Sequence, residues 1–228
     1  MKLTFAYDRN RDIWCVLNYG KTSINSPTST KIYEQLTKQY GEQVSESEAD
    51  AFIESYMSIE GIKPDELIPK LQDNWNIIAE EYHKRAEEIF GVVLPRDVIA
   101  YVTINDRCPY SIEDNMFYVS TAYPNAINKT VMHELWHFYT WFKYGAEWEK
   151  KLGAQKYNEL KEALTALLNI ECKDLLPEGI IDRGYPQHQE LRQKILDPAT
   201  STNPNARGRR RPGGVVVVKT KDGKELRG

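Results

Sequence analysis

The sequence contains few cysteines, only three in 228 residues, at Cys15, Cys108 and Cys172. They are widely separated, odd in number, and no two of them form a Cys-x-x-Cys pair. A disulfide framework uses an even set of cysteines and a thiolate zinc site uses closely spaced pairs, so neither is indicated. A single thiol could act as a nucleophile, but the pattern favours buried, inert cysteines.

Long hydrophobic runs are also missing. The first ten residues lack the apolar core of a signal peptide, and no stretch approaches the length of a membrane span. We therefore expect no membrane partner and a cytoplasmic location. The net charge is only −3 at pH 7, so the chain as a whole gives no reason to expect nucleic-acid binding.

The strongest positive signal is the H-E-x-x-H motif formed by His133, Glu134 and His137. Residues four apart lie one turn apart on the same face of a helix, so the two imidazoles can reach one metal ion. Glu134 projects beside them, where its carboxylate could act as a general base toward a water molecule on the metal.

The surroundings of the motif predict a helix. Apolar residues recur there at spacings of three or four, at Ile127, Val131, Leu135, Phe138 and Phe142. Asn125 or Asn128 can cap the helix, and Gly145 is expected to end it. A buried amphipathic helix with two hydrogen-bonded histidines is the alternative interpretation. The coincidence of all three functional positions favours a metal site instead.

A catalytic zinc site takes three protein ligands and leaves one position open for water. No histidine follows at the metzincin spacing, so the third ligand is expected to be a carboxylate. The helical segment 157–170 offers Glu162 and Glu159, with Glu171 a weaker candidate. We favour Glu162 because it lies opposite the apolar stripe, among small residues that would let another helix approach: Ala163, Thr165, Ala166 and Asn169. A solvated helix face is the remaining alternative.

On these residues the chain resembles the zincin metallopeptidases of the gluzincin type, in which a downstream glutamate follows H-E-x-x-H. The resemblance covers residues 97–170 and implies Zn²⁺ as cofactor and a peptide or protein as substrate. The thermolysin family has its glutamate in an Asn-Glu pair, which Asn158 and Glu159 match. A looser likeness, to the ImmA/IrrE-type peptidases, rests on Glu162-Ala163 followed by Leu175-Leu176-Pro177. The chain lacks the glycine usual before the second histidine of that group.

The resemblance also points to further parts of a hydrolase site. Gluzincins often stabilise the tetrahedral oxyanion with a Tyr or His from a later segment, and Tyr185 and His188 are side chains of that kind. An ordinary surface loop is the alternative for this segment. In zinc peptidases an edge strand holds the extended substrate, and the predicted strand 116–121 is the candidate. His83 lacks a suitably spaced partner and is expected to be a core or partly exposed residue.

The fold expected is α+β and zincin-like, with one domain at residues 1–199 and a flexible basic tail at 200–228. Strands are predicted at 2–7, 12–17, 97–105 and 116–121, with a turn at 8–11. Helices are predicted at 31–40, from the apolar spacing of Ile32, Leu36 and Tyr40, and from Ser45 through Tyr56, where Ser45 and Glu48 resemble a capping box. Two more are predicted at 71–90 and at 157–170. In the tail, Val215 to Lys219 and Asp222-Gly223 could form a hairpin. The cluster Arg207 to Arg211 supports the rival hypothesis, a non-catalytic protein that binds nucleic acid.

Overall fold

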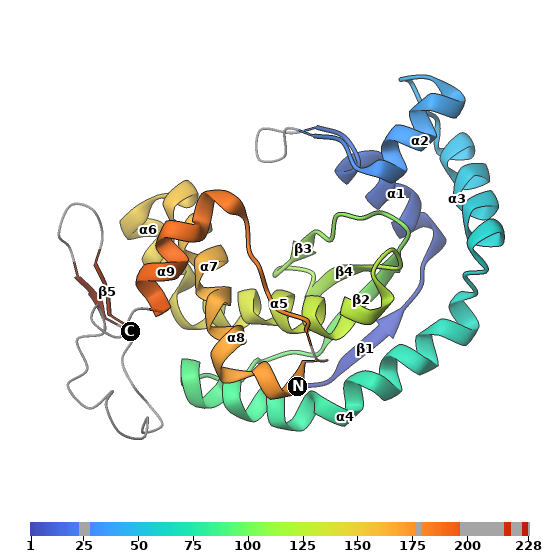
Figure 1. Ribbon diagram of the computed structural model, residues 1–228. Coiled ribbons are helices and arrows are strands. Elements are labelled where there is room, and N and C mark those ends of the chain that lie inside the picture. The colour runs from blue at the N-terminus through green and yellow to red at the C-terminus, as the bar shows by residue number, and fades with distance from the viewer. Residues whose placement is uncertain (23–27, 177–178, 197–216, 220–224, 228) are drawn as a thin grey trace. The chain divides into compact units, whose positions relative to one another are not determined.

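The computed structural model describes residues 1–22, 28–176, 179–196, 217–219 and 225–227 (Figure 1). The chain divides into two units, residues 1–77 with 95–131, and residues 78–94 with 132–228. The fold is mixed α+β and mostly helical, with one small four-stranded sheet, so the predicted fold class is confirmed at that level. None of the described helices combines the length and apolar character that crossing a membrane requires.

The sheet lies in the first unit and has the strand order β1-β2-β4-β3. β1 (Leu3–Ala6), β2 (Val98–Thr103) and β4 (Met116–Ser120) run parallel, and β3 (Tyr110–Ser111) pairs antiparallel with β4. The strands predicted at 2–7, 97–105 and 116–121 are therefore confirmed. The prediction that 116–121 forms an edge strand is wrong, because β4 lies between β2 and β3 and the short β3 takes the edge.

The strand predicted at 12–17 is wrong, because these residues belong to helix α1 (Arg9–Tyr19). Asp8 is its N-cap, and its side chain accepts a hydrogen bond from the Arg11 N–H at 3.0 Å. The polar segment at 8–11, predicted as a turn between strands, is thus the cap and first turn of a helix. α1 buries Ile13 and Val16 against the other helices of this unit.

The next three helices follow the predictions more closely. α2 (Lys31–Tyr40) has the predicted bounds, and α3 (Glu46–Glu60) begins with the predicted capping box of Ser45 and Glu48. α4 (Pro64–Phe90) begins seven residues before the predicted start at residue 71. Pro64 opens it and acidic residues fill its first turn, both of which favour a helix N-terminus.

Helices make up most of the second unit. α5 (Ile127–Thr140) carries the H-E-x-x-H motif, and a π-helical turn, Trp141–Gly145, connects it directly to α6 (Ala146–Leu152). α7 (Ala154–Leu164) continues through a 3₁₀ turn, Thr165–Leu167, into α8 (Leu168–Glu171). After the 3₁₀ turns Lys173–Leu175 and Pro186–His188, the short helix α9 (Gln189–Leu196) packs against α7.

Gly145 does not end the helical run, contrary to the prediction. A Cβ at this position would lie 2.3 Å from the ring of Trp141, so glycine is needed for that ring to pack over the backbone. Its φ of −49° and ψ of −63° are right-handed helical values, and the chain continues into α6. This glycine therefore serves packing inside the helical run rather than helix termination.

The aromatic residues of α5 form a core with the end of α4. The ring of Phe90 packs edge-on against Trp136 at 4.9 Å and stacks on Tyr139 at 5.8 Å between centroids. Tyr82 donates a hydrogen bond to the Met132 carbonyl at 2.8 Å. This packing accounts for the buried aromatic residues of the motif helix and fixes its orientation in the second unit.

Two strands are described near the C-terminus. β5 (Val217–Lys219) and β6 (Glu225–Arg227) pair antiparallel, as expected for the predicted hairpin. Asp222-Gly223 and the basic cluster Arg207 to Arg211 lie outside the described residues.

Candidate metal centre

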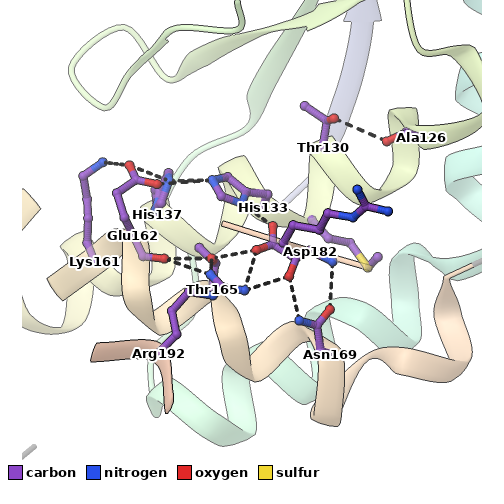
Figure 2. Close-up of polar contacts among 12 residues, drawn as sticks. Ala126, Thr130, His133, His137, Lys161, Glu162, Thr165, Asn169, Asp182 and Arg192 are labelled. Carbon is purple, nitrogen blue, oxygen red and sulfur yellow. Dashed lines mark hydrogen bonds and ion pairs between the residues drawn. The ribbon is translucent and has the colours of Figure 1, made fainter. Parts of the chain in front are cut away.

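Helix α5 brings His133 and His137 onto one face, as the motif predicts. Their Nε2 atoms lie 3.1 Å apart, and their rings meet edge to face (Figure 2). The side chain of His137 is 1% exposed and that of His133 14%. Apolar neighbours on the same helix are fully buried, so the core fixes the direction in which both imidazoles point.

Glu162, on the last turn of α7, completes the group. Its Oε1 lies 3.3 Å from His137 Nε2, and its Oε2 lies 3.5 Å from His133 Nε2. The three donor atoms lie within 4.8 Å of one another, and within the described part of the chain they form the single group of this kind. Glu159, the alternative ligand, instead accepts a hydrogen bond from Gln155 on an exposed part of α7. Glu171 is not part of the group either.

The spacing of these donors fits a small divalent ion. Nitrogen and oxygen ligands at 2.0–2.1 Å from a tetrahedral zinc ion lie about 3.3 Å from one another. The two Nε2 atoms are 3.1 Å apart and His137 Nε2 lies 3.3 Å from Oε1, both close to that value, whereas the 3.5 Å contact of His133 is to the other carboxylate oxygen, Oε2. Oε2 of Glu162 is buried and accepts no hydrogen bond from the described residues, which leaves it available as a ligand atom. The residues present therefore fit a bound metal ion.

Burial and charge set the protonation of the three donors. Burial lowers the pKa of His137 to about 3, so its imidazole is neutral and can donate a lone pair. Burial also lowers the pKa of His133, but Asp182 and Glu162 outweigh this and raise it to about 10. The pKa of Glu162 would rise on burial, yet the two histidines and Lys161 hold it below its usual range. The carboxylates around His133 thus stabilise a positive charge there. A metal ion bound at His133 Nε2 would replace the proton and benefit from the same negative charges.

Asp182 orients His133. Its Oδ2 lies 2.5 Å from His133 Nδ1, and the residue is 2% exposed. A hydrogen bond from Nδ1–H to this carboxylate leaves Nε2 as the atom facing Glu162 and His137. The sequence alone does not identify this carboxylate. The available signal was its position at the start of the segment that also contains Tyr185 and His188.

A buried polar network fixes Asp182 in turn (Figure 2). Arg192 Nη2 donates to Asp182 Oδ1 at 2.9 Å and to the Asp182 carbonyl at 2.7 Å. Asn169 exchanges two hydrogen bonds with the Asp182 backbone. The Thr165 hydroxyl accepts from Arg192 Nη1 and lies within donating distance of both Asp182 Oδ1 and the Glu162 carbonyl. We call this set of Thr165, Asn169, Asp182 and Arg192 the Asp182 network.

Lys161 is a further site residue that sequence reasoning missed. It is 5% exposed, and its Nζ donates to Glu162 Oε1 at 2.7 Å. Nothing in its spacing distinguishes it from Lys156, the other lysine of α7. Its proximity to the metal group depends on the side chain turning inward at the end of the helix.

The remaining predicted residues are placed as follows. Glu134 is buried beside His133, and its negative charge contributes to the raised pKa of that histidine. Tyr185 is 52% exposed, and its ring meets His188 edge-on at 5.8 Å between centroids. His188 is buried, and its Nδ1 has no hydrogen-bond partner among the described residues. Neither Tyr185 nor His188 belongs to the three-residue metal group. His83 bonds Tyr139 instead of joining the group, as expected for a core histidine.

The fold and site together define a mixed α+β protein with a candidate His-His-Glu metal centre on α5 and α7. A scan against models of protein families found no match, and neither did searches of curated proteins and of solved structures. The functional assignment therefore depends on the geometry of the chain's own residues.

Proposed function

We propose that this chain is a zinc-dependent peptidase of the zincin type, with His133, His137 and Glu162 as metal ligands. The observation that carries the proposal is the convergence of these three side chains, whose donor atoms lie within 4.8 Å of one another, with Glu134 next to the first histidine. Two imidazoles and one carboxylate form a common donor set of catalytic zinc, which leaves a fourth position open.

Each residue has a distinct role in the proposed hydrolysis. When bound, Zn²⁺ lowers the pKa of a coordinated water to about 7 and polarises a carbonyl oxygen. Glu134 accepts the proton of the attacking water and passes it to the leaving amine. Asp182 holds His133 in the tautomer that presents Nε2 to the metal.

The segment after Asp182 supplies the candidate groups for the oxyanion. His188 has a buried ring nitrogen without a described partner, and Tyr185 packs on its ring. An N–H or O–H from either side chain would stabilise the negative oxygen of the tetrahedral species. The proposal assigns them this role because they are the polar rings that follow the metal ligands in the chain.

Elemental analysis and a base variant test the proposal together. The purified protein should contain one zinc per chain, and H137A should lose it, because removal of one of three ligands weakens the site severely. E134Q should keep zinc and lose peptide cleavage. New protein N-termini appearing in cells that express wild type, compared with E134Q, would identify the cleavage products.

Three results would contradict the proposal. Protein without stoichiometric metal at neutral pH would remove the metal centre. Bound iron in place of zinc would move the site to another chemistry, because two histidines and a carboxylate also hold non-haem iron. Equal cleavage by wild type and E134Q would exclude Glu134 as the base. H83A is a suitable control for H137A, because His83 lies outside the metal group.

A further inference from the structure

The two oxygens of the Glu162 carboxylate have different surroundings. Oε1 accepts a hydrogen bond from Lys161 Nζ at 2.7 Å, whereas Oε2 accepts none from the described residues (Figure 2). A hydrogen bond in which both partners are charged is strong and directional, so it resists rotation of the carboxylate. Glu162 therefore has one oxygen bound to the Lys161 ammonium and a second, Oε2, that faces His133 Nε2 at 3.5 Å.

The main chain at Glu162 is held as well. Its carbonyl accepts a hydrogen bond from Arg192 Nη1 at 3.3 Å and lies 2.8 Å from the Thr165 hydroxyl. With the backbone fixed by the Asp182 network, rotation of the side chain is the remaining freedom of the third ligand. The Lys161 ammonium restricts this rotation, because it donates a hydrogen bond to one oxygen of the carboxylate.

Stability alone does not account for a lysine at this position. The side chain of Lys161 is only 7% exposed, and burying an ammonium costs desolvation free energy that its ion pair has to offset. An apolar side chain of similar length would fill the same space without that cost. Lys156, on the same helix, is exposed and shows the usual environment of a helical lysine.

We infer that Lys161 is a positioning residue that holds Glu162 as a single-oxygen metal ligand and thereby keeps the bound ion four-coordinate, with its fourth position left to water. The inference rests on the proposed metal centre. Without the ammonium, the carboxylate is free to turn and offer both oxygens to the ion. The second carboxylate oxygen would then join the ion as a fifth ligand beside its water, and no positive charge would oppose the cation from this side.

This role predicts an unusual combination of effects. A lysine that merely supported the fold would, when removed, weaken metal binding. A lysine that restrains the carboxylate would, when removed, leave metal binding equal or tighter and change the coordination geometry. Co²⁺ distinguishes the two, because a four-coordinate Co²⁺ ion absorbs visible light several-fold more strongly than a five-coordinate one.

The experiment is a Co²⁺ titration of the metal-free full chain, followed by visible absorption, for wild type, K161M, K161A, K161Q and K156M. We expect K161M and K161A to bind one Co²⁺ at least as tightly as wild type, with a several-fold loss of absorbance per bound ion. K161Q keeps a hydrogen-bond donor and should recover most of the absorbance. K156M, the matched control, should behave as wild type.

The outcomes separate this inference from the proposed function. Wild type that binds no Co²⁺ overturns the metal centre and the inference with it. Wild type that binds Co²⁺, together with a wild-type spectrum in K161M or K161A, overturns the inference alone. Loss of Co²⁺ binding in a K161M protein with native circular dichroism also overturns it, because the role of Lys161 is then structural. If K161M does not fold, K161A provides the same comparison with wild type.

Discussion

The hydrogen bond between Asp182 and His133 leads to the most specific quantitative prediction, the effect of D182N on zinc affinity. The bond spans 2.5 Å between Nδ1 and Oδ2, in a site where Asp182 is 2% exposed. Replacing a carboxylate that orients a metal-binding histidine typically costs 10–100-fold in metal affinity, or about 1.4–2.7 kcal/mol. We expect D182N to weaken zinc binding by this amount.

The surroundings of Asp182 place the expected loss at the upper end of this range. An asparagine whose oxygen accepts from His133 Nδ1–H must turn its NH₂ group toward Arg192 and Thr165. Arg192 is itself a donor at that position, bonding Asp182 Oδ1 at 2.9 Å. Both His133 and Arg192 donate to this side chain, but an amide has only one acceptor oxygen. In either orientation the NH₂ group therefore faces another donor.

A competition titration measures the effect. Metal-free wild type and D182N are titrated with Zn²⁺ against a chelator of known affinity, and urea unfolding in excess chelator reports the stability of each metal-free fold. R192M is the control, because it breaks the same buried ion pair but keeps the carboxylate beside His133. We expect R192M to lose less than tenfold in affinity. A D182N affinity within about twofold of wild type, or an equal loss in R192M, would refute the orienting role.

Three further predictions concern stability. Burial raises the pKa of the Asp12 carboxyl to about 6. Relative to D12N, the wild type should therefore lose about 2 kcal/mol of unfolding free energy as the pH rises from 4 to 7. A difference that stays constant in urea titrations at these pH values would contradict this. G145A should destabilise the fold by about 1–3 kcal/mol because its Cβ meets the Trp141 ring; a higher melting temperature, normal for Gly→Ala in a helix, would exclude this packing. S45A should cost about 1 kcal/mol in urea unfolding, and no change would argue against the capping box.

Local signals explain which elements could be predicted. The capping box at Ser45 and Glu48 and the apolar spacing of α2 report interactions within a few residues, and both helices were predicted correctly. Segment 12–17 shows the opposite case, because its short apolar run fits a strand as well as a helix. The segment is helical, with Asp8 as its N-cap, whereas the sequence prediction places Asp8 in a turn between two strands.

The candidate site also contains residues that local sequence patterns predict and residues that they do not. His133, Glu134 and His137 are linked by helical spacing alone, and Glu162 could be favoured over Glu159 from the small residues around it. Asp182 and Lys161 join the site through tertiary packing that no local pattern encodes. In the sequence Lys161 looks like any solvated lysine, and only the fold shows that its side chain is buried with its ammonium on the Glu162 carboxylate.

The guanidinium of Arg192 also links the candidate metal group to the docking of helix α9. It bonds the backbone of Glu162 and both the carbonyl and the carboxylate of Asp182, so α9 and the donor atoms are ordered together. Thermodynamic linkage makes this relation reciprocal, since whatever ion the site retains must also tighten the hold on α9. Protease resistance of this C-terminal segment therefore serves as a gauge of metal loading.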